Sequence, residues 1–207
     1  GAEEYCCGGP ALCVGRRDVA KRMVEHNIES VNRSGAKVLV TGCAGCYNMF
    51  HVKASEITDM KMNFKVMHTS ELIDSLIREG RLRFSRRLDL KVTYHDPCHL
   101  GRLSEPWVPG KPTGVQHYEV PRNILQAIPG VKLVEMERVK ESSWCCGAGA
   151  GVKAAFPDFA LWTARERLEE ARTTGAEALA TACPFCITNL KDASNNNMKI
   201  YDIVQLT

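Results

Sequence analysis

Apolar side chains recur at helical spacing in the last third of the chain. Four of them lie three or four positions apart, as they would along one face of an α-helix. Gly175 follows as a stop, and the run Glu-Ala-Leu-Ala-Thr at 177–181 has the composition of a short strand. The pattern predicts a helix followed by a strand. The residues of the apolar face are Leu161, Ala164, Leu168 and Ala171.

The same order of elements is predicted near the start of the chain. Val19, Met23 and Val31 give a helical stripe, Gly35 ends it, and Lys-Val-Leu-Val-Thr at 37–41 is strand-like. This alternation of helices and strands is typical of an α/β fold. Each predicted strand is followed at once by a Cys-x-x-Cys sequence. Open α/β sheets place ligands at the carboxyl ends of their strands, so these cysteines lie where a ligand is expected.

Four further elements are predicted between and after these stretches. A one-sided apolar pattern predicts a helix over 69–80, and residues 90–95 predict a strand that runs into a loop at Pro97 and Cys98. Residues 104–121 contain four prolines and two glycines, which predicts a surface loop or lid. The closing run, 199–206, predicts a last strand and the start of a helix.

An internal repeat organises the chain. The sequence CCGGPALCVG aligns with CCGAGAGVKA, and SGAKVLVTGCAGCYNMF aligns with TGAEALATACPFCITNL. The offset is 139 residues between Cys6 and Cys145 and 140 between Cys43 and Cys183. Four cysteines in register indicate a duplicated module. We therefore expect two pseudo-symmetric Rossmann-like α/β lobes, each carrying a Cys-Cys-Gly motif, with metal near their interface. The expected lobes are residues 1–80, lacking an amino-terminal part, and residues 81–207.

The cysteine content narrows the function. Ten of the 207 residues are cysteine, although a chain of this length can bury a core without disulfides. Because we find neither a signal peptide nor a membrane-spanning apolar run, we expect a cytoplasmic protein, with any attachment to the inner face of the membrane made through partner subunits. In that reducing compartment, clustered cysteines more often hold metal or do redox chemistry. The formal net charge of +3 is too small to indicate nucleic acid binding.

The cysteines fall into two sets. The first set contains four thiols, and the second contains five because it includes Cys98. By the repeat offset, a fifth cysteine of the first set would lie upstream of Gly1, so we expect a fragment, a processed product or a partly observed subunit. The first set is Cys6, Cys7, Cys43 and Cys46, and the second set is Cys98, Cys145, Cys146, Cys183 and Cys186.

Three interpretations of the two sets are open. Buried structural cysteines have no reason to recur in a repeated pattern. Structural zinc takes four ligands, which suits the first set, but adjacent cysteines rarely bind one small ion together. Iron–sulfur clusters suit adjacent thiolates, because each can bind a different iron, and five soft ligands exceed the needs of a single ion. Ligand count favours an iron–sulfur cluster at the second set. It leaves the first set open to a second cluster, zinc or no metal.

Glycines follow the second Cys-Cys pair. Gly147, Gly149 and Gly151 would let the backbone approach a cluster and direct N–H groups at its sulfurs, which raises the reduction potential. A dinucleotide-binding loop is less favoured, because the spacing is GxGxG and no strand clearly precedes it. A thioredoxin-like pair at 183–186 is also less favoured, because it would not need the companion cysteines.

Polar residues flank Cys98. His95, Asp96, His99 and Arg102 could supply a proton or hold an anionic substrate, or they could fix the loop by hydrogen bonds. We select His99 and Arg102 as candidate catalytic residues, because they could protonate or steady a thiolate released beside the metal.

Four further residues are expected to take no part in the chemistry. Cys13 has no counterpart in the second copy and is expected to be a bystander. Phe156, Phe159 and Trp162 are expected in the core rather than at a cofactor.

Five segments together resemble the cysteine-rich CCG domain of heterodisulfide reductase catalytic subunits. The resemblance extends to the iron–sulfur subunits of anaerobic glycerol-3-phosphate, glycolate and lactate oxidation, and to a membrane-complex subunit tied to dissimilatory sulfite reduction. The segments span nearly the whole chain and are EEYCCGGP, TGCAGCYNMF, YHDPCHLGR, ESSWCCGAGAGV and TACPFCITNLKDA.

The resemblance implies a five-cysteine non-cubane [4Fe–4S] cluster at the second set, where a small or protein disulfide is split in two one-electron steps. It also implies partner subunits of a redox complex: a ferredoxin-like protein, a flavoprotein or a membrane cytochrome. Two alternatives are an electron-transfer subunit between a flavin dehydrogenase and a quinone or membrane cytochrome, and a zinc-stabilised interaction module. We expect the second set to be the working site.

Overall fold

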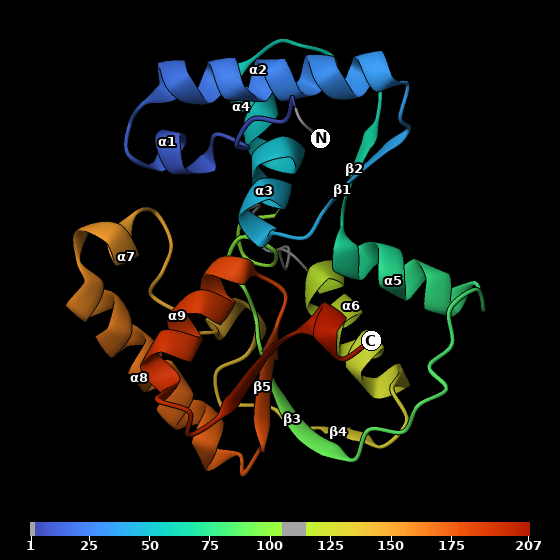
Figure 1. Cartoon of the computed structure of the whole chain (residues 1–207), viewed down its shortest axis with the longest axis vertical. Coiled ribbons are helices and arrows are strands. Elements are labelled where there is room, and N and C mark those ends of the chain that lie inside the picture. The colour runs from blue at the N-terminus through green and yellow to red at the C-terminus, as the bar shows by residue number, and fades with distance from the viewer. Residues whose placement is uncertain (1–2, 105–114) are drawn as a thin grey trace.

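The computed structural model describes residues 3–104 and 115–207, and it alternates helices with parallel strands (Figure 1). This confirms the predicted α/β class. The first part of the chain contains α1 (Gly9–Cys13), α2 (Arg17–Ser34), β1 (Val38–Thr41), α3 (Ala44–Asn48), the π-helix η1 (Met49–Lys53), α4 (Ala54–Ile57), β2 (Lys65–His68) and α5 (Thr69–Arg78). The rest contains β3 (Leu90–His95), α6 (Val115–Ala127), β4 (Val131–Leu133), the 3₁₀ helix η2 (Lys140–Ser142), α7 (Val152–Ala155), α8 (Pro157–Thr173), β5 (Ala178–Thr181), α9 (Pro184–Ser194), β6 (Lys199–Asp202) and the 3₁₀ helix η3 (Ile203–Gln205).

Two separate parallel sheets carry these elements. β1 and β2 form the first sheet, which lies with α1 to α4 in the upper part of Figure 1. The second sheet has the order β4-β3-β5-β6 and lies below it. Every residue of β5 is buried, as expected for an inner parallel strand with helices packed around it. The carboxyl ends of β1 and β5 lead directly to Cys43 and Cys183, as predicted.

The long helices α2 and α8 support the two cysteine pairs. On α8, the buried face contains the predicted Ala164, Leu168 and Ala171, and Leu161 is half-buried. On α2, the predicted stripe is displaced by one position: Val19 and Met23 are half-buried, while their neighbours Ala20 and Val24 are buried completely. The small buried side chains Ala20 on α2 and Ala160 on α8 allow close approach of other backbone.

The predicted loop over 104–121 is wrong from residue 115 onward, where α6 begins. The helix tolerates Pro121 and buries Ile124 and Leu125, which pack it against α5 and β4. Proline content outweighed this apolar periodicity in the prediction. Residues 105–114, the remainder of the predicted lid, lie outside the described residues. The helix predicted over 69–80 and the strand and helix start predicted over 199–206 are present.

The expected core placement of three aromatic residues is wrong. Phe156, Phe159 and Trp162 are exposed by 65%, 56% and 54%, respectively. Phe159 and Trp162 stack with their ring centroids 5.9 Å apart. Helix α8 turns Ala160 and Ala164 toward the core, so Phe159 and Trp162 fall on its outer face.

No helix in the described ranges 3–104 and 115–207 is long and apolar enough to cross a membrane.

Candidate metal centre

The second Cys-Cys-Gly segment is held against α8. Gly147 adopts the left-handed region at φ 85°, and its N–H donates to the Sγ of Cys145 at 3.3 Å. A Cβ at Gly147 would lie 2.6 Å from the carbonyl oxygen of Ala160. Only glycine combines this φ with such close packing, so Gly147 sets the position of both adjacent cysteines.

The first Cys-Cys-Gly segment repeats this arrangement on α2. Gly8 has a φ of 83°, and a Cβ there would lie 3.0 Å from the carbonyl oxygen of Ala20. The thiol of Cys7 accepts a hydrogen bond from the backbone N–H of Gly9. Two stretches 139 residues apart thus adopt the same left-handed glycine turn, and each packs against an alanine of the long helix that follows it.

Each Cys-x-x-Cys sequence begins a helix. Cys43 is the N-cap of α3 and Cys183 is the N-cap of α9. Neither side chain closes a capping hydrogen bond, but the nearby backbone N–H groups of Cys46 and Cys186 act to lower the pKa of Cys43 and Cys183, respectively. Free N–H groups in the first turn of a helix stabilise negative charge, which contributes to the lowered pKa of Cys43. At Cys183 the hydrogen bond to Cys43 and burial outweigh this effect and raise the pKa to about 11.

The two sets of cysteines meet in one sulfur array. We use this name for the nine cysteines of both sets, which are joined by hydrogen bonds between successive thiols. Cys183 of the second set is bonded to Cys43 of the first, and this contact joins the sets. Cys13 is exposed on α1. In order of contact the array runs Cys6, Cys7, Cys46, Cys43, Cys183, Cys186, Cys146, Cys145 and Cys98.

One thiol in each set is strongly acidified by its neighbours. Hydrogen bonds from Cys183 and Cys46 lower the pKa of Cys43 to about 2. Hydrogen bonds from Cys146 and Cys98 lower the pKa of Cys145 to about 2. The pKa of Cys98 is raised, because it is the partner that keeps its proton. The array therefore holds protons that a thiophilic metal would displace.

His95 completes the buried part of the second set. A ring nitrogen of His95 and the Sγ atoms of Cys146 and Cys186 all lie within 4.8 Å of one another. All three residues are buried, with His95 only 1% exposed. Burial lowers the pKa of His95 to about 3, so the imidazole is neutral at physiological pH. This grouping has the composition and size of a metal site.

Asp96 fixes the loop that carries Cys98. Its carboxylate accepts a bidentate pair of hydrogen bonds from Arg122 at 2.8 and 3.0 Å, and a third from the backbone N–H of Lys140 at 2.8 Å. Asp96 and Arg122 are both buried, and Arg122 also binds Glu135. Asp96 was expected either to act on a substrate or to fix the loop by hydrogen bonds, and the structure shows the hydrogen bonds that fix the loop.

The two candidate catalytic residues have different environments. His99 is half-buried, with Nδ1 3.4 Å from the Sγ of Cys98, and burial lowers its pKa. Arg102 is exposed and donates to the backbone carbonyl of Ser143. His99 therefore contacts the array directly, whereas the hydrogen bond of Arg102 stabilises the segment before Trp144.

Of the three glycines that were expected to direct N–H groups at sulfur, only Gly147 does so. Gly147 donates to sulfur, but Gly149 faces open space and Gly151 begins α7 with a φ of 80°. The second N–H that reaches sulfur belongs to Ala148, which donates to Cys146. A backbone donor needs no particular side chain, so sequence inspection could not identify Ala148.

Several residues that support the site were missed. Arg167 of α8 is fully buried and binds His95 and Ser143. Asn189 of α9 donates to the carbonyl oxygen of Cys146 at 2.7 Å. The sequence did contain a signal for Arg167, because it is a charged residue within the apolar face of α8. A buried polar group needs specific partners, so such a position indicates a defined role.

Aromatic and imidazole rings gather beside Cys43. Tyr47 of α3 lies against the rings of His68 and His117, with centroid distances of 6.2 and 5.3 Å. The hydroxyl of Tyr47 is 3.4 Å from Nε2 of His117. Burial lowers the pKa of His68 to about 4. The neutral imidazole of His68 therefore lies on this side of the array.

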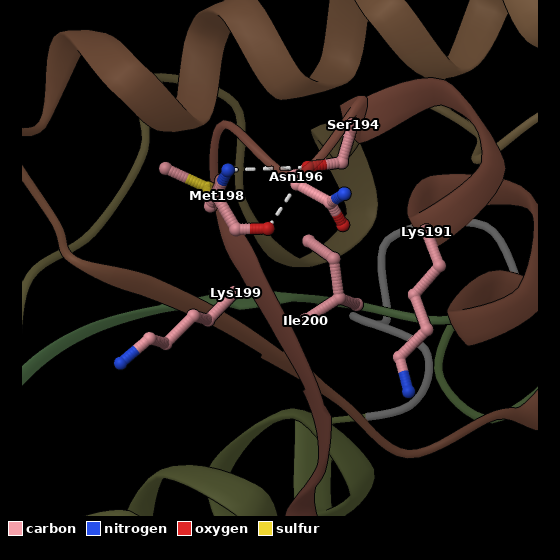
Figure 2. Close-up of a pocket in the computed structure, with 6 residues that line it drawn as sticks. All are labelled: Lys191, Ser194, Asn196, Met198, Lys199 and Ile200. Carbon is pink, nitrogen blue, oxygen red and sulfur yellow. Dashed lines mark hydrogen bonds between the residues drawn. The ribbon is translucent and has the colours of Figure 1, made fainter.

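Two cavities differ in their relation to the array. A cavity of about 550 Å³ is lined by Cys7, Cys43 and Cys46 together with Leu39 and Val40 of β1. Figure 2 shows another hollow at the far end of α9, where the Ser194 hydroxyl donates to the Met198 carbonyl and accepts from the Met198 N–H. Only the first of these two cavities touches the cysteines.

Comparison with known proteins agrees with the two cysteine sets. The model of the cysteine-rich CCG domain matches residues 2–51 and 92–191, and the chain belongs to this family. The family resemblance expected from the five sequence segments is thereby confirmed.

Several curated relatives are redox proteins. The chain is 41% identical over 212 residues to a subunit of the dihydromethanophenazine:CoB–CoM heterodisulfide reductase of Methanosarcina acetivorans, covering 100% of this chain and 49% of that protein. It is 33% identical to EtfAB:quinone oxidoreductase of Syntrophomonas wolfei (100% and 28% covered) and 30% identical to a subunit of the fumarate reductase (CoM/CoB) of Methanothermobacter marburgensis (98% and 38% covered). The chain thus spans half or less of the length of these relatives.

Proposed function

We propose that this chain is the iron–sulfur part of an oxidoreductase subunit that reduces a disulfide or a related sulfur substrate. The observation that carries the proposal is the sulfur array, in which two Cys-Cys and two Cys-x-x-Cys sequences from distant parts of the chain meet. The 41% identity to a heterodisulfide reductase subunit supports the choice of a sulfur substrate.

The donor set fits an iron–sulfur group. The second set offers five thiols, whereas tetrahedral zinc would use four and leave an adjacent thiol unused. Backbone N–H groups of Gly147 and Ala148 already point at sulfur, as in proteins that stabilise such groups. We therefore assign a non-cubane [4Fe–4S] cluster to the second set, and a further iron–sulfur cluster or zinc to the first. The proposed ligands of the cluster are Cys98, Cys145, Cys146, Cys183 and Cys186.

Disulfide reduction consumes two electrons and two protons and releases two thiols. A bound iron–sulfur group supplies electrons one at a time, and a partner redox subunit of the ferredoxin, flavoprotein or cytochrome class replenishes them. His99 lies against Cys98 and is placed to donate a proton to a sulfur released there. Arg102 is exposed nearby and would steady the negative charge of a thiolate.

We further propose that the two sheets belong to two copies of one module, residues 1–80 and 81–207. The matching turns at Gly8 and Gly147, packed on Ala20 and Ala160, support this duplication.

A relay of electrons without sulfur chemistry is the second candidate function. The identities of 33% and 30% to a quinone oxidoreductase and a fumarate reductase subunit favour it. In that role the array would pass electrons between a flavoprotein and a quinone or cytochrome partner.

The test uses the full-length protein reconstituted with iron and sulfide under anaerobic conditions. Wild type should contain iron and acid-labile sulfide, and its reduced form should be reoxidised by a small disulfide. Cys145→Ser should abolish this reoxidation, Cys6→Ser should mainly reduce stability, and Cys13→Ser should behave as wild type. Reoxidation by a quinone analogue but by no disulfide would support the relay instead. Zinc without iron would contradict both.

A further inference from the structure

Arg167 is the largest fully buried side chain among the described residues. Its Nε lies 3.1 Å from Nδ1 of His95, and its Nη2 lies 3.1 Å from the hydroxyl of Ser143. Its Nη1 binds the carboxylate of Glu170 at 2.6 Å. Burying a guanidinium is costly unless its donors have partners. With the carbonyl oxygen of Arg138 at 2.9 Å from Nη1, these bonds engage four of its five N–H groups. One side chain therefore joins the end of β3 to the segment before Cys145.

The contact with Arg167 decides which nitrogen of His95 carries the proton. A guanidinium has no acceptor, so Nδ1 of His95 must accept the hydrogen bond from Nε. A neutral imidazole then carries its only N–H at Nε2. An imidazole that accepts a hydrogen bond at Nδ1 cannot carry a proton there, so this contact itself selects the neutral form.

The tautomer with its proton on Nε2 decides whether His95 can bind a metal or can only donate a hydrogen bond. Its imidazole lies beside Cys146 and Cys186, within the 4.8 Å grouping that resembles a metal site. A metal ligand needs a free lone pair, but Nδ1 is used by Arg167 and Nε2 carries a proton. A hydrogen-bond donor needs only the N–H, and the sulfur atoms of Cys146 and Cys186 can accept it.

We propose that His95 donates a hydrogen bond from Nε2 to sulfur of the second cysteine set, and that Arg167 is the positioning residue that fixes its tautomer. The inference rests on the proposed iron–sulfur function. Hydrogen bonds to cluster sulfur stabilise the added electron and raise the reduction potential. His95 and Arg167 thus make the second set easier to reduce.

Arg167 has no arginine counterpart in the first set. The repeat places Asn27 of α2 at the position of Arg167. Asn27 accepts a hydrogen bond from the N–H of Tyr5 and donates to the carbonyl oxygens of Tyr5 and Cys6. It therefore holds backbone and orients no ring. The two sets are expected to differ in reduction potential even if both hold iron and sulfide.

The experiment measures the midpoint potential of the reconstituted full-length protein by redox titration, with iron and sulfide analysis of each variant. His95→Leu should lower the potential, by about 59 mV if the one-electron equilibrium changes tenfold. His95→Gln retains an amide N–H and should recover much of the loss. Arg167→Gln should lower the potential while His95 remains in place. Arg165→Gln, at an exposed position of the same helix, is the matched control and should leave the potential of the second set unchanged.

Pulsed electron paramagnetic resonance on the wild-type protein labelled with ¹⁵N-histidine gives an independent answer. Weak coupling to a histidine nitrogen that remains in His99→Gln, where the ring beside Cys98 is removed, supports a donor. Coupling as strong as that of a directly bound nitrogen overturns it. An unchanged potential in His95→Leu with full iron content also overturns it, and leaves the proposed function intact. If His95→Leu fails to bind iron, the wild-type spectrum still decides. A wild-type chain that binds no iron and sulfide removes the proposed function, and this inference with it.

Discussion

The Cys183 thiol donates a hydrogen bond to the sulfur of Cys43, and this contact joins the cysteines that follow β1 to those that follow β5. Both residues cap the helix that comes after their strand. Two metal groups held on either side of this contact would be within direct electronic reach of each other. Under the proposed function, the arrangement would provide two adjacent one-electron sites for a two-electron substrate.

Replacing Cys43 should alter the electronic environment of the second cysteine set. We expect Cys43→Ser to change the electron paramagnetic resonance spectrum of the second set while the iron bound there stays constant. Cys13→Ser provides the control, because Cys13 is exposed. Identical spectra for Cys43→Ser and wild type would show that the two sets act independently.

Gly147 and Gly149 should respond very differently to alanine. Gly147→Ala places a Cβ 2.6 Å from the Ala160 carbonyl oxygen at a φ of 85°, so we expect a loss of at least about 2 kcal/mol in the free energy of unfolding, with weakened iron binding. Gly149→Ala meets no atom within 4 Å and should be tolerated. Urea titrations and iron analysis of both variants check this. Equal effects would mean that the packing of Gly147 on α8 is unimportant.

Arg122 should matter far more than a surface arginine. Arg122→Met leaves the buried carboxylate of Asp96 without its bidentate partner, which should cost on the order of 3 to 5 kcal/mol. Arg81→Met breaks an exposed ion pair with Glu79 and should cost less than about 1 kcal/mol. Thermal and urea unfolding of the two variants compare these costs. A small effect of Arg122→Met would show that the loop before Cys98 is held by other contacts.

His68 should make the metal-free protein sensitive to acid. Burial lowers its pKa from 6.5 to about 4, so between these pH values the unfolded chain binds a proton that the folded chain excludes. Stability should be full above about pH 6.5 and fall as the pH drops toward 4, by on the order of 3 kcal/mol. His68→Gln should flatten this slope, and His51→Gln, at an exposed position, should not. Parallel slopes for His68→Gln and wild type would contradict the assignment.

The cysteine pattern could be predicted from the sequence because the repeat is local. Each Cys-Cys-Gly and Cys-x-x-Cys sequence defines its own turn, so the left-handed turn at Gly147 and the helix start at Cys183 follow from a few adjacent residues. The contact between Cys43 and Cys183 depends on how two sheets lie together. No short segment of the sequence specifies that placement.

The errors have a similar origin. Pro121 and nearby glycines dominated the interpretation of 115–121, but tertiary packing of Ile124 and Leu125 keeps α6 helical. Trp162 was expected in the core rather than at a cofactor, whereas α8 packs through the face that carries Ala160 and Ala164. Arg167 was missed because its partners, His95 and Ser143, lie 72 and 24 residues away.

The first sheet has a consequence for handling the isolated chain. Within the described residues β1 pairs with β2 alone, and Val38 and Val40 are exposed by 42% and 40%. The other edge of β1 therefore offers unpaired N–H and C=O groups beside apolar side chains, a combination that recruits further strands. Concentration-dependent self-association through this edge is the first solution behaviour to expect. A charged residue in place of Val40 is the simplest way to keep the purified chain monodisperse.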